Sequence, residues 1–87
     1  MSEEYVEAIL LWSDRGPSES VSAWFRERSL AVTPMRAGML LAGPLEVFEK
    51  AFHLALADAA RPVSLPVPDE LKAHVVSITI PRPRRLH

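Results

Sequence analysis

Two runs of apolar residues along the chain are almost unbroken. One of them, Ala8 to Trp12, lies within the segment 5–13, which is rich in β-branched and large apolar side chains, and the other covers residues 39–42. An apolar run without alternation is typical of a strand that is covered on both faces. We therefore expect both segments to be central strands of a sheet.

Two further segments have the features of edge strands. Residues 30–33 stop at Pro34, and proline is found mainly at the edge of a sheet because it lacks an N–H donor. Residues 74–80 alternate in polarity, and this pattern predicts a half-buried edge strand. The residues expected to share one of its faces are Val76, Ile78 and Ile80.

Between these strands, apolar residues recur every three or four positions, which predicts two amphipathic helices. The first covers residues 17–28. The second begins after Pro44 and ends at Arg61, because the residue before a proline avoids helical geometry.

Ahead of the last strand the sequence reads LPVPDELKA, whose prolines force an extended approach and leave room for one helical turn over residues 69–73. The element order is therefore β-α-β-β-α-β. It predicts an α+β, ferredoxin-like sandwich, in which a four-stranded antiparallel sheet carries both helices on one face. We expect residues 1–80 to form this single domain and residues 81–87 to be a basic tail rich in proline and arginine.

The composition excludes several classes of function. No cysteine is present, so disulfides and thiolate chemistry are excluded. The net charge of −1 provides no general attraction for nucleic acid, and the run at 39–42 has no aromatic side chain on which a base could stack. No apolar run is long enough to cross a membrane, and the acidic start of the chain has no signal-peptide pattern. These features predict a cytoplasmic protein that binds neither nucleic acid nor membrane.

No set of polar residues suggests a reaction. The histidines lack the spacing of metal ligands, so we expect no metal, no cofactor and no catalytic residue. An enzyme that used a cleft between the helices and the sheet would need a polar constellation, and the candidates for it do not form a recognisable one. These candidates are Asp14, Arg15, His53 and His74.

A different kind of site follows from the apolar excess. Two helices can cover only one face of the predicted sheet, and strand alternation leaves large apolar side chains on the other face. The segment 60–68 and the chain ends could screen part of that face. Otherwise it forms an interaction surface, because a sizeable apolar patch is unusual on a monomer. The residues expected on it are Tyr5, Ile9, Leu11 and Leu40.

The run VSAWFRERSLAVTPMRAGMLLAGPLEVFEKAFHLAL, followed by LPVPDELKAHVVSI, resembles the activation propeptide of kumamolisin/sedolisin-type serine peptidases over about residues 20–80. The positions that match the family's second helix are Gly43, Phe48, Glu49, Ala51 and Phe52. Those that match its turn before the last strand are Pro66 or Pro68, Leu71 and Val75. Ser29 stands at a helix end where the family often has glycine.

The resemblance implies a role in which the open sheet face packs on a catalytic domain. No catalytic domain follows in this sequence, so the chain would be a free-standing relative. The tail would then lie in the peptidase cleft as a poorly cleavable segment. The tail residues expected to contact the partner are Pro81, Arg82, Pro83 and Arg84.

Two functions are therefore expected. The first is a non-enzymatic protein-binding module whose partner is another protein, such as a serine peptidase, or a second copy of the chain. The alternative is a structural subunit that forms a homo-oligomer by packing sheet face against sheet face.

Overall fold

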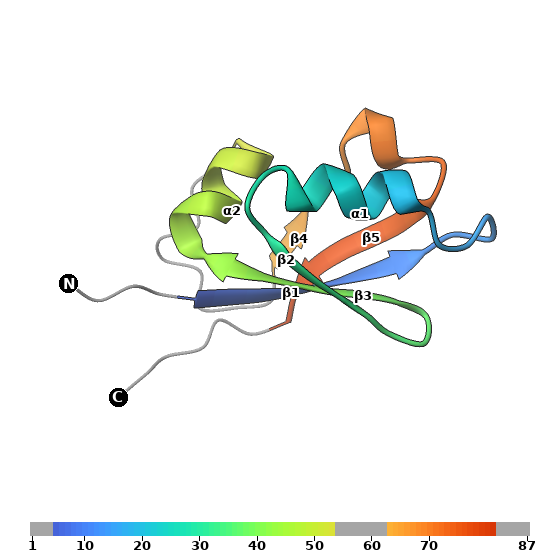
Figure 1. Cartoon of the computed structure of the whole chain (residues 1–87), viewed down its shortest axis with the longest axis horizontal. Coiled ribbons are helices and arrows are strands. Elements are labelled where there is room, and N and C mark those ends of the chain that lie inside the picture. The colour runs from blue at the N-terminus through green and yellow to red at the C-terminus, as the bar shows by residue number, and fades with distance from the viewer. Residues whose placement is uncertain (1–4, 54–62, 82–87) are drawn as a thin grey trace.

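The computed structural model describes residues 5–53 and 63–81 (Figure 1). Its elements, in chain order, are β1 (Tyr5–Trp12), α1 (Glu19–Arg26), β2 (Ala31–Pro34), β3 (Gly38–Pro44), α2 (Leu45–Phe52), β4 (Val63–Leu65), a short 3-10 helix η1 (Asp69–Leu71) and β5 (Val75–Ile80). The α+β class and the β-α-β-β-α-β order of the longer elements are confirmed. The single turn expected before the last strand is η1.

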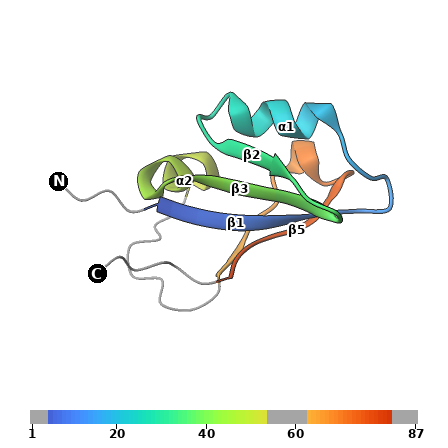
Figure 2. The ribbon, with the colours of Figure 1, turned by 60° about the horizontal axis from the view of Figure 1, so that its bottom comes forward.

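The strands form one antiparallel sheet in the order β2-β3-β1-β5-β4. Both helices lie on the same side of this sheet, as the two ribbon views show (Figures 1 and 2). The strands β1 and β3 each have a neighbour on both sides, and β2 lies at an edge. The central positions of β1 and β3 and the edge position of β2 are as the apolar runs and Pro34 predict.

The sheet has five strands, and the expectation of four was wrong. The additional strand, β4, pairs with β5 over Val63–Leu65 and takes the edge position that was expected for β5. With only three residues between two prolines, β4 is too short to show a period of its own. Pro62 and Pro66, which have no N–H to donate, are compatible with an edge strand.

The predicted alternation of the last strand was wrong at its first two residues. The register between β1 and β5 shifts between Leu11 and Trp12, which is the signature of a bulge. Val75 is therefore turned into the core, with 4% of its surface exposed, and Val76 is turned out, with 61% exposed. Beyond the bulge the alternation holds, and Ile78 and Ile80 are buried together. The physical reason is that one extra residue in a strand moves the side chains of the preceding residues to the opposite face of the sheet.

The second helix is shorter than predicted. Helix α2 ends at Phe52, and His53 adopts a left-handed conformation with φ of 57° while its N–H donates to the carbonyl oxygen of Glu49. A residue in this conformation ends an α-helix. A continuous helix as far as Arg61 is therefore wrong, and residues 54–61 lie outside the described part of the chain.

The core lies between the helices and the sheet. Its centre contains the phenyl rings of Phe25, Phe48 and Phe52, with centroids 6.2 Å apart for the pairs Phe25–Phe52 and Phe48–Phe52. The sheet contributes Leu10, Leu41 and Ile78, each of which is fully buried. All these buried side chains come from the helices and from one face of the sheet, so the hydrophobic stabilisation of the fold comes from that face.

Candidate functional site

The strand β1 divides its side chains between two environments. Val6, Ala8 and Leu10 belong to the core. The alternate residues point to the face without helices: Tyr5 is 57% exposed, Leu11 is 42% exposed and Ile9 is half-buried. Because β1 is the middle strand of five, Ile9 and Leu11 lie between β3 and β5 on the open face, while Tyr5 lies at the start of β1, beyond its pairing with β5.

The strand register places these residues in rows that cross the sheet. Ile9 pairs with Leu40 on β3 and with Thr79 on β5. Leu40 in turn pairs with Thr33 on β2, and Thr79 pairs with Ser64 on β4. One row therefore spans all five strands, with two large apolar side chains in the middle and hydroxyl groups toward both edges.

The neighbouring rows differ from this one. Leu11 pairs with Gly38 on one side and with Ser77 on the other, while Glu7 pairs with Ala42. Tyr5 completes the apolar series at the start of β1. We call Tyr5, Ile9, Leu11 and Leu40 the open-face stripe. It is two strands wide and narrower than the sequence suggests, since β5 and β4 contribute the hydroxyl groups of Ser77, Thr79 and Ser64, with Val76 as the exposed apolar residue of β5.

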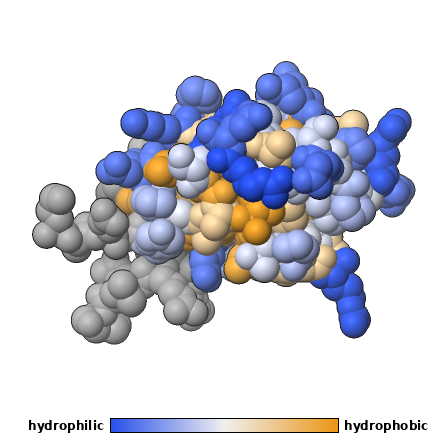
Figure 3. Space-filling model, in the orientation of Figure 1, coloured by the Kyte–Doolittle hydropathy of each residue, from blue (hydrophilic) through white to orange (hydrophobic). Residues whose placement is uncertain are grey.

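Gly38 explains why Leu11 is so accessible. A Cβ atom at Gly38 would collide with the carbonyl oxygen of Leu10, so the close approach of β3 to β1 requires glycine here. The partner of Leu11 on β3 therefore has no side chain to cover it. The surface view, taken with the helices above the strands, looks at the side of the sheet and not onto its open face; it shows hydrophobic residues in the middle of the molecule and mostly hydrophilic residues around them (Figure 3).

The tail residues expected at the same surface are only partly visible. Pro81 follows β5 directly and is exposed. Arg82, Pro83 and Arg84 lie outside the described residues, so their relation to the open-face stripe stays a prediction.

The polar residues considered for catalysis do not form one cluster. His74 lies in the loop before β5, where its Nδ1 is 3.3 Å from the carbonyl oxygen of Gly16. Ser13 ties the end of β1 to the same loop, because its Oγ donates to the carbonyl oxygen of Ala73 at 2.8 Å and accepts from the N–H of Arg15 at 3.2 Å. His53, by contrast, follows α2 and lines a cavity on the helical side.

These contacts give Ser13 a loop-capping role at the end of β1. Across the part of the chain that the structure describes, there is no group of three or more histidine, aspartate or glutamate side chains that could hold a metal ion. The same residues include no helix long and apolar enough to cross a membrane.

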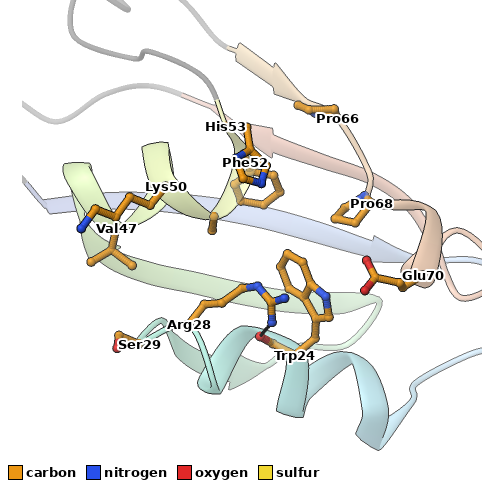
Figure 4. Close-up of a pocket in the computed structure, with 11 residues that line it drawn as sticks. Trp24, Arg28, Ser29, Val47, Lys50, Phe52, His53, Pro66, Pro68 and Glu70 are labelled. Carbon is orange, nitrogen blue, oxygen red and sulfur yellow. Dashed lines mark hydrogen bonds between the residues drawn. The ribbon is translucent and has the colours of Figure 1, made fainter.

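The cavity near His53 was missed in the sequence. It has a volume of about 630 Å³ and lies between α1, α2 and the segment before η1 (Figure 4). Its walls come from residues more than forty positions apart, such as Trp24 and Pro68, so no local pattern reveals it. The one local signal is the i, i+4 spacing of Trp24 and Arg28, which puts a cation beside an aromatic ring.

No family model, curated protein or solved structure matches this chain. The resemblance to peptidase propeptides therefore stays a prediction based on packing residues. The functional inferences below depend on the fold, the open-face stripe and the cavity.

Proposed function

We propose that the chain is a non-enzymatic protein-binding module that presents the open-face stripe to a partner protein, as a propeptide caps its peptidase. One observation carries the proposal: the middle strand of the sheet exposes Leu11, although β3 and β5 flank it there, and exposes Tyr5 at its start. A middle strand in a small domain normally buries its large side chains. Contiguous exposed apolar residues of this kind mark interaction surfaces.

The surroundings of the stripe suit an interface. Hydroxyl side chains flank it toward both edges of the sheet, namely those of Thr33, Ser64, Ser77 and Thr79. Protein interfaces commonly combine an apolar centre with a polar rim that forms hydrogen bonds. The open face has this arrangement, which supports a protein partner over a small-molecule substrate.

The fold supports the propeptide comparison. Without β4, the strand order β2-β3-β1-β5 with both helices on one side is that of a ferredoxin-like sandwich, which we take to be the parent architecture. Ser29, where the family often has glycine, adopts the left-handed conformation with φ of 69° that glycine suits. Under this proposal the open-face stripe would pack on a serine peptidase and the tail from Pro81 onward would enter its cleft.

The alternative, a homo-oligomer, is favoured by the charge of the open face. Among the described residues of that face, Glu7 carries the only charge. Two copies could therefore pack face to face with little electrostatic repulsion, provided that the two Glu7 side chains are offset. Neither function requires a reactive group on this chain.

A single substitution tests the surface on which both functions depend. Leu11→Lys places a charge at the exposed end of the stripe, while Met35→Lys places one on an exposed apolar residue in the turn after β2. We expect the wild-type chain to inhibit a sedolisin-type peptidase in a dose-dependent way. Leu11→Lys should raise the inhibition constant at least about tenfold, because a lysine in an apolar interface is desolvated, and Met35→Lys should leave it unchanged.

Light scattering at micromolar concentration separates the two functions. A monomer that inhibits the peptidase supports the capping module, and deletion of residues 81–87 then shows whether the tail blocks the cleft. A dimer that dissociates on Leu11→Lys, without inhibition, supports the homo-oligomer. A wild-type monomer that inhibits nothing contradicts both, and equal effects of Leu11→Lys and Met35→Lys show that the interface lies elsewhere.

A further inference from the structure

The helical side of the sheet carries a second feature, which is unrelated to the open-face stripe. The cavity of about 630 Å³ between α1 and α2 has apolar walls formed by Trp24, Val47, Phe52 and Pro68 (Figure 4). Small-molecule sites in proteins usually have volumes of about 300–1,000 Å³ and largely apolar walls with a few polar groups. The cavity has the size and lining of such a site.

Beside the cavity, the indole of Trp24 carries a buried hydrogen-bond donor without an acceptor among the described residues. The indole Nε1 of Trp24 is fully buried, and no acceptor among the described residues lies within hydrogen-bonding distance. In Figure 4 this edge of the indole ring faces the side of the cavity where Pro68 and Glu70 lie. The Nε1 of Trp24 has almost no accessible surface, so a ligand in the cavity contacts the ring of Trp24 and not this N–H.

A guanidinium group is fixed beside the same ring. The Cζ of Arg28 lies 3.6 Å from the centroid of the Trp24 ring, and its Nη1 donates to the carbonyl oxygen of Trp24 at 2.9 Å. The carboxylate of Glu27 is 3.9 Å from the same nitrogen. These contacts hold the side chain in place and use one of its nitrogens, which leaves most of its N–H donors for other acceptors.

The charges that line the cavity are unequal. Arg28, Lys50 and His53 contribute donors, and Glu70 is the single carboxylate among the described lining residues. Lys50 extends along α2 toward the far end of the cavity in Figure 4, so Arg28 is the cation next to Trp24. One fixed guanidinium suits a carboxylate monoanion better than a phosphate dianion, which needs more donors.

We propose that this cavity binds a small carboxylate whose body is aromatic or branched aliphatic. The carboxylate oxygens accept hydrogen bonds from the guanidinium of Arg28, which lies beside the ring of Trp24. The apolar body packs against Phe52 and Val47. Glu70, at the edge of the site, weakens the binding of an anion.

Nuclear magnetic resonance of the intact chain tests this site directly. The chain has two tryptophans, so a proton–nitrogen correlation spectrum contains two indole signals, and Trp12→Phe assigns them. We expect 3-phenylpropanoate to shift the Trp24 indole signal saturably at millimolar concentration and to leave the Trp12 signal in place. The neutral analogue 3-phenylpropanamide should bind about tenfold more weakly. Inorganic phosphate without an apolar body should cause no saturable shift.

Three variants sharpen the test. Arg28→Gln should weaken 3-phenylpropanoate about tenfold and abolish its advantage over the amide. Arg26→Gln is the matched control on the same helix, because Arg26 pairs with Glu19 at 2.9 Å and does not line the cavity, and it should bind normally. Glu70→Gln should bind two- to threefold more tightly. An unmoved Trp24 signal, equal binding of acid and amide, or unchanged binding by folded Arg28→Gln would overturn the proposal.

Discussion

The same strands supply both faces of the sheet, and the two faces have different roles. On the helical face, Leu10, Leu41 and Ile78 are fully enclosed by the phenylalanine cluster of the helices. On the open face, Leu11 and Leu40 face outward, and the row that contains Leu40 ends in hydroxyl groups. Burial of apolar surface supplies most of the stability of a small domain, so the helical face holds the fold together.

This difference makes the apolar residues of the open face dispensable for folding. A side chain that is already partly in contact with water in the native state loses little hydrophobic stabilisation when it is truncated. The open-face stripe can therefore be changed to alter binding while the core keeps its packing. Paired substitutions in β1 and in β5 test this separation of the two faces, and a substitution of Ser29 tests how α1 is joined to the sheet.

The largest effect is expected from two adjacent leucines of β1. Leu10→Ala removes a fully buried side chain from the core and should lower the free energy of unfolding by about 2–5 kcal/mol. Leu11→Ala makes the same chemical change on the open face and should lower it by less than about 1 kcal/mol. Urea unfolding followed by circular dichroism measures both values.

Equal losses for the two leucines would contradict the separation of the faces. They would mean that Leu11 is covered in solution, either by the chain itself or by a second copy. Repeating the unfolding at several protein concentrations distinguishes these cases, because stability that depends on association rises with concentration.

The bulge between β1 and β5 yields the next prediction. Val75→Thr buries a hydroxyl group in the core and should lower the free energy of unfolding by about 1–3 kcal/mol. Val76→Thr makes the same change on an exposed residue and should stay within about 0.5 kcal/mol of the wild type. The pair is measured by the same urea unfolding. A regular strand without the bulge would reverse the order, with Val76→Thr as the damaging change.

Strong local patterns allowed much of the fold to be predicted. The unbroken apolar run of β1, the edge proline of β2 and the periodic spacing of α1 each correspond to an element of the structure. The alternation in β1 also placed Ile9 and Leu11 on a common face. These features depend on neighbouring residues only, so the sequence contains them directly.

The remaining features depend on tertiary contacts. β4 has three residues and is a strand only because β5 lies beside it. The bulge at Val76 arises from the register between β1 and β5, and neither strand alone reveals it. The cavity requires Trp24 and Pro68 to meet across the fold. The apolar part of the open face is narrower than expected because β4 and β5 place hydroxyl groups on it. This also depends on which strands pair with one another, which the sequence of a single strand does not show.

The smallest expected effect concerns the join between α1 and β2, on the helical side alone. Ser29 has a φ of 69°, which strains any residue with a Cβ atom, while the N–H of Ser29 donates to the carbonyl oxygen of Arg26 at 3.0 Å. Ser29→Gly relieves this strain but increases the freedom of the unfolded chain. The net result should be a gain of about 0.5–1 kcal/mol in the free energy of unfolding.

Ser20→Gly is the matched control for that gain, because it makes the same substitution at an exposed position inside α1. There the backbone is right-handed and glycine only adds freedom to the unfolded chain, so we expect a loss of about 0.5 kcal/mol. Thermal unfolding of both variants should therefore move the melting temperature in opposite directions. A loss on Ser29→Gly would mean that the Ser29 side chain supports this helix end more than its backbone conformation strains it. The join between α1 and β2 would then depend on that side chain as well as on the core beneath it.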